Sequence, residues 1–234
     1  MWYPQNKQEL NRIVSKYLKS GKKAKPAIGL IVPHAGYEYS GEIAGKAFCV
    51  VKNQNIDKAI IIGPSHYVHL FDALTSNRKY WETPLGKIKL FNKKFMVGDI
   101  KIEHSITNQV PFLQKIGVKQ IMPLMIGKIT DKQAEEIAKK ISKIKAIYIF
   151  STDLSHFMPY EKAVETDKKT IKIIEELNFE QFKYIDACGY FPLLILFHLC
   201  KIKNKKPRLI EYKNSGDITN DKESGVVGYA SFWF

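Results

Sequence analysis

Three short apolar runs constrain the fold of this chain more than any other feature. They cover residues 27–32, 58–63 and 146–151, and they are rich in Ile and Ala. Runs of this length that end near Pro, Gly or Ser are typical of strands buried on both faces of a sheet. Two segments with helical character, 40–52 and 129–143, lie between them. The alternation predicts an α/β fold with a mixed, largely parallel central sheet flanked by helices.

The remaining segments extend the same pattern. Helical spacing of apolar residues predicts further helices over residues 5–19, 160–177 and 190–201. Further strands are predicted, the first of them at a sheet edge, over residues 84–90, 120–127, 208–213 and 226–234. The chain has no evident repeat, low-complexity tract or linker, so we expect a single domain over residues 1–234.

The charge of the chain is strongly basic, at +14, which raises the question of nucleic-acid binding. Arginine is the residue best suited to bidentate contacts with phosphates and bases, and the chain has only Arg12, Arg78 and Arg208. The lysines are spread along the whole sequence. We therefore expect solvated lysines on helix faces and no nucleic-acid partner.

Other features of the composition point to the cytoplasm. No apolar run approaches the roughly 20 residues of a membrane span, and the N-terminus lacks the pattern of a secretory signal. The three cysteines, Cys49, Cys188 and Cys200, are too few for a disulfide framework and fit a reducing compartment. No CxxC pair exists, which argues against a closed structural zinc site.

Each of the three buried runs leads into a turn that carries histidine. His34 follows the first run, His66 follows the second, and Asp153 and His156 follow the third. The carboxyl ends of parallel strands share one edge of a sheet, and ligands of α/β proteins bind in the crevice beyond that edge. Because these turns hold three of the six histidines, we expect them to form a functional site.

Two kinds of chemistry fit these residues. Neutral imidazole is the commonest metal ligand, and carboxylate or thiolate completes many sites. The alternative is metal-free acid–base chemistry by Asp153 and His156, which would project from one side of a helical turn. Cys188 precedes a predicted helix, where the helix dipole would lower its pKa, or it is a small buried residue. Spacing alone does not distinguish it from Cys49 or Cys200.

Seven motifs occur in an order that resembles the Memo family. They are VPHAGYEYSG, GPSHY, TPLGKI, EHSITNQVPFL, STDLSHF, CGYFPL and NSGDITNDKESGVVGYASF. The resemblance runs from residue 2 to the C-terminus. It implies a fold like that of the class III extradiol dioxygenases, which open catechol rings with non-haem iron(II). It also implies partners of two kinds, an AMMECR-type protein and a radical-SAM protein.

The resemblance also implies roles for particular residues. His34, His66 and Cys188 match the metal ligands of the family, with iron as the first expectation and copper or zinc as alternatives. Asp153 and His156 match its pocket acid and histidine, and we expect them to be catalytic. Three further residues from the same motifs are expected in the pocket: Ser65, Tyr37 and His104.

Three functions remain open at this stage. The first is a metal-dependent redox or dioxygenase-like enzyme that acts on a small molecule. The second is a non-catalytic module that uses the pocket to bind a phosphorylated or carboxylated partner such as an acidic peptide. The third is a zinc hydrolase. The chain departs from the family pattern at Thr107, where the family usually has Glu, and at its start, which lacks the usual residues before Trp2 and is expected to be truncated or misassigned.

Overall fold

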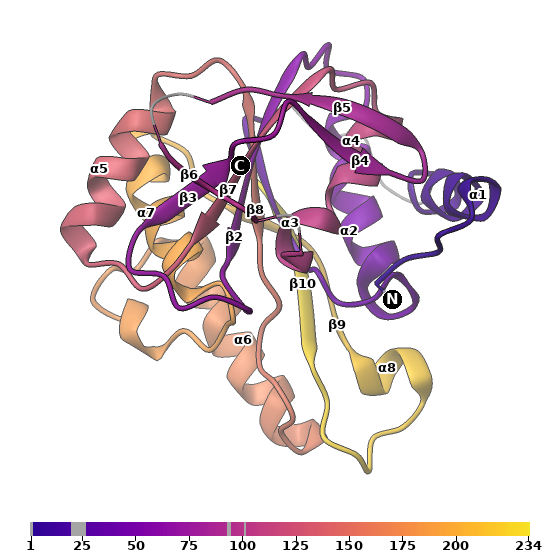
Figure 1. The fold of residues 1–234 in the computed structure, drawn as a ribbon. Coiled ribbons are helices and arrows are strands. Elements are labelled where there is room, and N and C mark those ends of the chain that lie inside the picture. Colours follow the sequence, from indigo (N-terminus) through magenta and orange to yellow (C-terminus); the bar gives the residue numbers. More distant parts are fainter. Residues whose placement is uncertain (1, 20–26, 93–94, 101) are drawn as a thin grey trace.

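The computed structural model describes residues 2–19, 27–92, 95–100 and 102–234 (Figure 1). Its described strands form one ten-stranded sheet. Four neighbouring parallel strands make the centre of the sheet: β7 (Gln120–Ile126), β2 (Lys58–Pro64), β8 (Ile147–Ser151) and β1 (Gly29–Val32). The predicted α/β class with a mixed, largely parallel sheet is therefore confirmed.

Further strands extend the sheet on both sides. Beside β1 lie β10 (Gly228–Trp233) and then β9 (Arg208–Asn214). Beside β7 lies β5 (Gly86–Leu90), which is parallel to β7 and forms an antiparallel pair with the outermost β4 (Tyr80–Thr83). The strand predicted over 84–90 is thus β5, one place inside the edge. Two short strands, β3 (Ala73–Ser76) and β6 (Met96–Gly98), pair off this path, and neither they nor β4 were predicted.

Helices cover both faces of the sheet, as Figure 1 shows. One face packs against α5 (Asp131–Ser142), α6 (Tyr160–Glu176) and α7 (Tyr190–Lys203). The other packs against α1 (Lys7–Tyr17), α2 (Tyr37–Val51) and α4 (Val110–Lys115).

The side chains on the two faces of a central strand pack in two separate hydrophobic cores. Successive side chains of a strand point to opposite faces. Accordingly, Ile60 and Ile62 of β2 pack in the core with α5 and α7, and Ile61 packs in the core with α1 and α2. All three side chains are fully buried. The continuous apolar run in β2 is therefore required because both of its faces are covered.

Local sequence explains where the helices begin. Thr130 and Gln133 form a capping box, which starts α5 inside the segment predicted to be helical, 129–143. The helix expected over 40–52 starts earlier than predicted, because α2 begins at Tyr37 after Gly36. Ser40 lies inside the helix and donates a hydrogen bond to the Ala35 carbonyl. Four short helices were also not predicted: α3 (His104–Thr107), α4, η1 (Phe182–Tyr184) and α8 (Ser215–Thr219).

The parallel strands place the predicted site residues at one edge of the sheet. β1, β2 and β8 run in the same direction, so the segments that follow Val32, Pro64 and Ser151 leave the same edge.

In the described part of the chain, no helix is long and apolar enough to span a membrane.

Candidate metal centre

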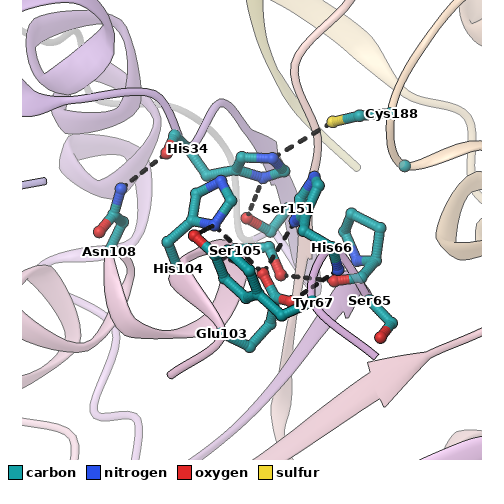
Figure 2. Close-up of polar contacts among 12 residues, drawn as sticks. His34, Ser65, His66, Tyr67, Glu103, His104, Ser105, Asn108, Ser151 and Cys188 are labelled. Carbon is teal, nitrogen blue, oxygen red and sulfur yellow. Dashed lines mark hydrogen bonds and ion pairs between the residues drawn. The ribbon is translucent and has the colours of Figure 1, made fainter. Parts of the chain in front are cut away.

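His34, His66 and Cys188 come together at the carboxyl edge of the sheet. The first two follow β1 and β2, and Cys188 lies two residues before α7. Their donor atoms, one ring nitrogen from each histidine and the thiol sulfur, all lie within 4.8 Å of one another. Figure 2 shows the three side chains pointing toward one another. These residues form the group that the family resemblance implied as a metal site.

His34 is the buried member of the group, with 1% of the residue exposed. Its Nδ1 lies 2.9 Å from Ser151 Oγ, and its Nε2 lies 3.2 Å from Cys188 Sγ. Burial and the nearby His66 lower the pKa of His34 to about 3. The imidazole is therefore neutral at physiological pH, which is the form that binds a metal.

His66 lies at the more exposed side of the site and is oriented by Glu103. Its Nδ1 lies 2.8 Å from Glu103 Oε1, and its backbone N–H donates to Glu103 Oε2 over 2.8 Å. The buried carboxylate also accepts a hydrogen bond of 3.0 Å from the Ser105 N–H. Burial would raise the pKa of Glu103, but these hydrogen bonds outweigh it and lower the pKa to about 2. Because an ionised carboxylate only accepts hydrogen bonds, His66 donates from Nδ1, and Nε2 remains for a metal.

The surroundings of Cys188 favour the protonated thiol. Burial and the neighbouring carboxyl of Asp153 raise its pKa far above the usual range, although the Asp153 backbone N–H donates to Sγ over 3.2 Å. Of the two alternatives for Cys188, burial and a like charge favour a small buried residue over a thiol whose pKa is lowered by the N-terminus of α7. A proton on Sγ can be donated to His34 Nε2, so we assign the remaining ring proton to Nδ1, which donates it to Ser151.

Asp153 supports the site through the backbone of His34. Its Oδ1 accepts a hydrogen bond of 2.7 Å from the His34 N–H. Burial raises the pKa of Asp153 to about 6, even though hydrogen bonds from the backbone of His34 and Ala35 lower it. The carboxyl group thus fixes the turn after β1 and is poised to change protonation near neutral pH.

His156 lies close to the site on the same segment. It is partly exposed, its ring contacts Phe157 edge-on, and its charge affects the pKa of both His34 and Asp153. Residues 152–156 have no helical structure, so Asp153 and His156 do not share a helical turn as the spacing suggested. The structure brings the two residues to one region without a direct hydrogen bond between them in the described contacts.

His104 belongs to a stack of rings beside His66. Its ring stacks on Trp2 with a centroid distance of 4.0 Å and lies 4.4 Å from the ring of His66. Its Nδ1 lies 3.0 Å from the Tyr67 hydroxyl. Burial, followed by the charges of His34 and His66, lowers the pKa of His104 to about 3. This histidine is therefore also neutral at physiological pH.

Ser65 and Tyr37 support the site from outside its first layer. The Ser65 hydroxyl donates to the Val68 carbonyl over 2.6 Å and closes the turn that carries His66. The Tyr37 hydroxyl donates to the Asn108 carbonyl over 2.7 Å. The Asn108 side chain in turn donates to the His34 carbonyl over 2.6 Å, so Tyr37 acts on the site through Asn108.

Sequence reasoning missed the residues that orient the two histidines, Glu103 and Ser151. Ser151 is the first residue of the STDLSH motif and the last residue of β8. Glu103 directly precedes His104, and both of its carboxylate oxygens form hydrogen bonds with His66. The one feature of the sequence that could have indicated Glu103 is its position next to a histidine at the start of a short helix. Its pairing with His66, 37 residues away, depends on the tertiary fold.

The donor set fits a metal ion. Two neutral imidazoles and one sulfur converge, and each imidazole has a partner at its other nitrogen, as metal-ligating histidines almost always do. The contact between His34 Nε2 and Cys188 Sγ holds together two atoms that an ion would bind. Imidazole and thiolate together suit zinc, copper and iron more than calcium or magnesium.

The chain is an α/β protein with a His/His/Cys group that could hold a metal ion, and sequence comparison identifies its family. The sequence model of the Memo-like protein family matches residues 1–233. A MEMO1 family protein of Sulfurisphaera tokodaii is 36% identical, over 91% of this chain and 84% of that protein. A second, of Thermoplasma volcanium, is 32% identical over 98% of this chain and 94% of its own length. A third, of Methanobrevibacter smithii, is 35% identical over 87% and 82%. The chain belongs to the Memo-like family.

Proposed function

We propose that this chain is a metal-dependent redox protein with dioxygenase-like activity on a small molecule. His34, His66 and Cys188 would hold the ion, with iron as our first expectation and copper or zinc as alternatives. The observation that carries the proposal is the convergence of three donor atoms within 4.8 Å at the carboxyl edge of the sheet. When bound, iron or copper would supply one-electron redox chemistry and Lewis acidity.

The residues around the ligands divide the remaining work. Ser151 and Glu103 orient the imidazoles of His34 and His66, which prepares both histidines to bind an ion with little rearrangement. His156 is partly exposed and would exchange a proton with a substrate at the mouth of the site. Asp153 would set the position of His34 and respond to the charge of His156.

We extend the proposal to the cellular location and the partners of the protein. Its cysteines are all free, and the thiol of Cys188 needs a reducing environment to remain a ligand, which favours the cytoplasm. An AMMECR-type protein and a radical-SAM protein are proposed as partners. This last step rests only on the family resemblance.

The metal content of the native protein tests the proposal. The protein would be purified without oxygen beside His34→Ala, Cys188→Ala and, as a control, His198→Ala, whose ring pairs with Asp131 away from the site. We expect close to one iron or copper ion per chain in the wild type and in the control, and little in the other two variants. Zinc as the bound ion, without oxygen-dependent turnover, would favour a hydrolase. Absence of metal even after reconstitution would favour a module that binds acidic partners.

A further inference from the structure

His66 belongs to a second group of metal-binding side chains. His66, Glu103 and His104 each offer a donor atom, and these atoms also lie within 4.8 Å of one another. Glu103 Oε1 is 2.8 Å from His66 Nδ1 and 3.4 Å from His104 Nδ1. Figure 2 shows this group on the side of His66 away from Cys188. Two histidines and one carboxylate make up the donor set typical of non-haem iron(II) oxygenases.

The state of the three side chains suits a cation. Glu103 is buried, and its ion-pair partners in the described part of the chain are the two histidines, with no lysine or arginine among them. His104 is held flat against Trp2, so its ring orientation is fixed. His66 and Tyr67 are exposed, which leaves a route for an ion from solvent. A negative charge between two fixed imidazoles is a suitable environment for a divalent ion.

We propose that His66, Glu103 and His104 form a second cation position, which takes a hard divalent ion such as Mn²⁺. The position with Cys188 takes softer ions, because thiolate selects for softness and carboxylate does not. A neutral imidazole has one free lone pair. Ions in both positions would require His66 to lose both ring protons, so the two positions exclude each other. The identity of the metal then selects the position that it occupies.

Manganese binding in the whole protein tests the second position. Mn²⁺ would be titrated and followed by the electron paramagnetic resonance of the free ion. The variants are Cys188→Ser, Glu103→Gln and His69→Ala, a control on the same loop as His66 that belongs to neither group. We expect Cys188→Ser and His69→Ala to bind Mn²⁺ within about threefold of the wild type. Glu103→Gln should weaken binding by more than about tenfold.

A second variant distinguishes loss of a metal ligand from misfolding, in case Glu103→Gln does not fold. His104→Phe keeps a ring against Trp2 and removes the nitrogen, so it should also lose Mn²⁺ while retaining the thermal midpoint of the wild type. No Mn²⁺ binding in the wild type, equal losses in Cys188→Ser and Glu103→Gln, or full binding in either Glu103→Gln or folded His104→Phe would overturn the proposal.

Cobalt(II) reports separately on the position with Cys188. A thiolate-to-cobalt charge-transfer band should appear in the wild type and in the control His69→Ala, and it should vanish in Cys188→Ser. Absence of this band from the wild type would count against the proposed function and leave the manganese result standing. The two proposals therefore fail in distinguishable ways.

Discussion

The imidazole of His34 connects the last residue of a central strand with the only thiol of the site. Nδ1 is 2.9 Å from Ser151 Oγ and Nε2 is 3.2 Å from Cys188 Sγ. The Ser151 hydroxyl also accepts a hydrogen bond of 3.0 Å from Gln109 Nε2, which fixes its position. This arrangement holds His34 with one nitrogen directed at the sheet and the other at the place where a metal would bind.

Removing the Ser151 hydroxyl should weaken metal binding. Ser151→Ala leaves Nδ1 of His34 without its acceptor, so the ring loses its fixed orientation. We expect the affinity for zinc to fall by roughly 10- to 100-fold in a competition titration with a chromophoric chelator. Ser142→Ala on α5, where the hydroxyl only bonds the Lys139 carbonyl, serves as the control. Equal affinities for Ser151→Ala and the wild type would show that this hydrogen bond has no part in ligation.

Zinc binding should release a proton from Cys188. The pKa of the thiol is raised above its ordinary value, so Sγ is protonated at neutral pH and must lose its proton to bind zinc. His34, with its pKa lowered to about 3, has no proton to lose from its metal-facing nitrogen at that pH. Calorimetry in buffers of different ionisation enthalpy should detect about one proton released per zinc ion, and affinity should rise with pH.

The same calorimetry on Cys188→Ser provides the control for the proton count. A serine hydroxyl stays protonated, so proton release should fall close to zero and the affinity should lose most of its dependence on pH. Release of a full proton from Cys188→Ser would assign the proton to another group and contradict the role given to the thiol.

Stability of the metal-free protein should decrease in mild acid because His104 is buried in the neutral form. Its pKa is lowered from 6.5 to about 3, so between these values the unfolded chain binds a proton that the folded chain does not. Stability from this residue is fully present above pH 6.5 and is lost as the pH falls toward 3. At pH 5 the loss should be roughly 1–2 kcal/mol relative to pH 7.

His104→Phe isolates this contribution from those of other titrating groups. His34 adds a loss of the same sign, and Asp153, with its pKa raised to about 6, acts in the opposite direction. Urea unfolding of the two proteins at pH 5 and pH 7 compares their changes. The variant should lose less stability than the wild type between these pH values. Identical losses would mean that His104 titrates normally in the folded protein.

Gly127 should be intolerant of a side chain because a loop of the site packs against it. A Cβ atom at this position would lie 1.9 Å from the Leu70 carbonyl oxygen. The Gly127 N–H donates a hydrogen bond to the Asp72 carbonyl, and the Lys128 N–H donates to the Leu70 carbonyl. These bonds fix the end of the loop that carries His66. Gly127→Ala should therefore destabilise the protein by roughly 1–3 kcal/mol and lower its metal affinity.

Gly36→Ala is the matched control for this substitution. Gly36 lies two residues after His34, but the nearest contact of an added Cβ would be an ordinary 3.6 Å. Thermal midpoints and zinc affinities of the two variants can be measured side by side. We expect Gly36→Ala to resemble the wild type. A Gly127→Ala protein that matched it in both properties would show that the loop adjusts freely.

The sequence predicted the centre of the fold because the apolar runs of the central strands fit only a position with both faces covered. Ile60, Ile61 and Ile62 leave no polar face, so β2 had to lie between two layers of helices. The short strands β3 and β6 escaped prediction because they span four and three residues and lack a periodic pattern of useful length. Helix α3, with four residues, is too short for periodicity to indicate.

The site could be predicted only as far as it follows from strand ends. His34 and His66 were found because each directly follows a buried strand. Cys188 lies before a helix, and only the family resemblance distinguished it from Cys49 and Cys200. Glu103 was missed because its burial and its contact with His66 arise from tertiary packing, to which no local pattern corresponds.

X-ray absorption at the zinc edge of the zinc-loaded protein tests the central claim most directly. If His34, His66 and Cys188 hold the ion, the first shell will contain one sulfur at about 2.3 Å and two imidazole nitrogens at about 2.0–2.1 Å. The sulfur should disappear in Cys188→Ser. A shell of nitrogen and oxygen alone in the wild-type protein would contradict the account.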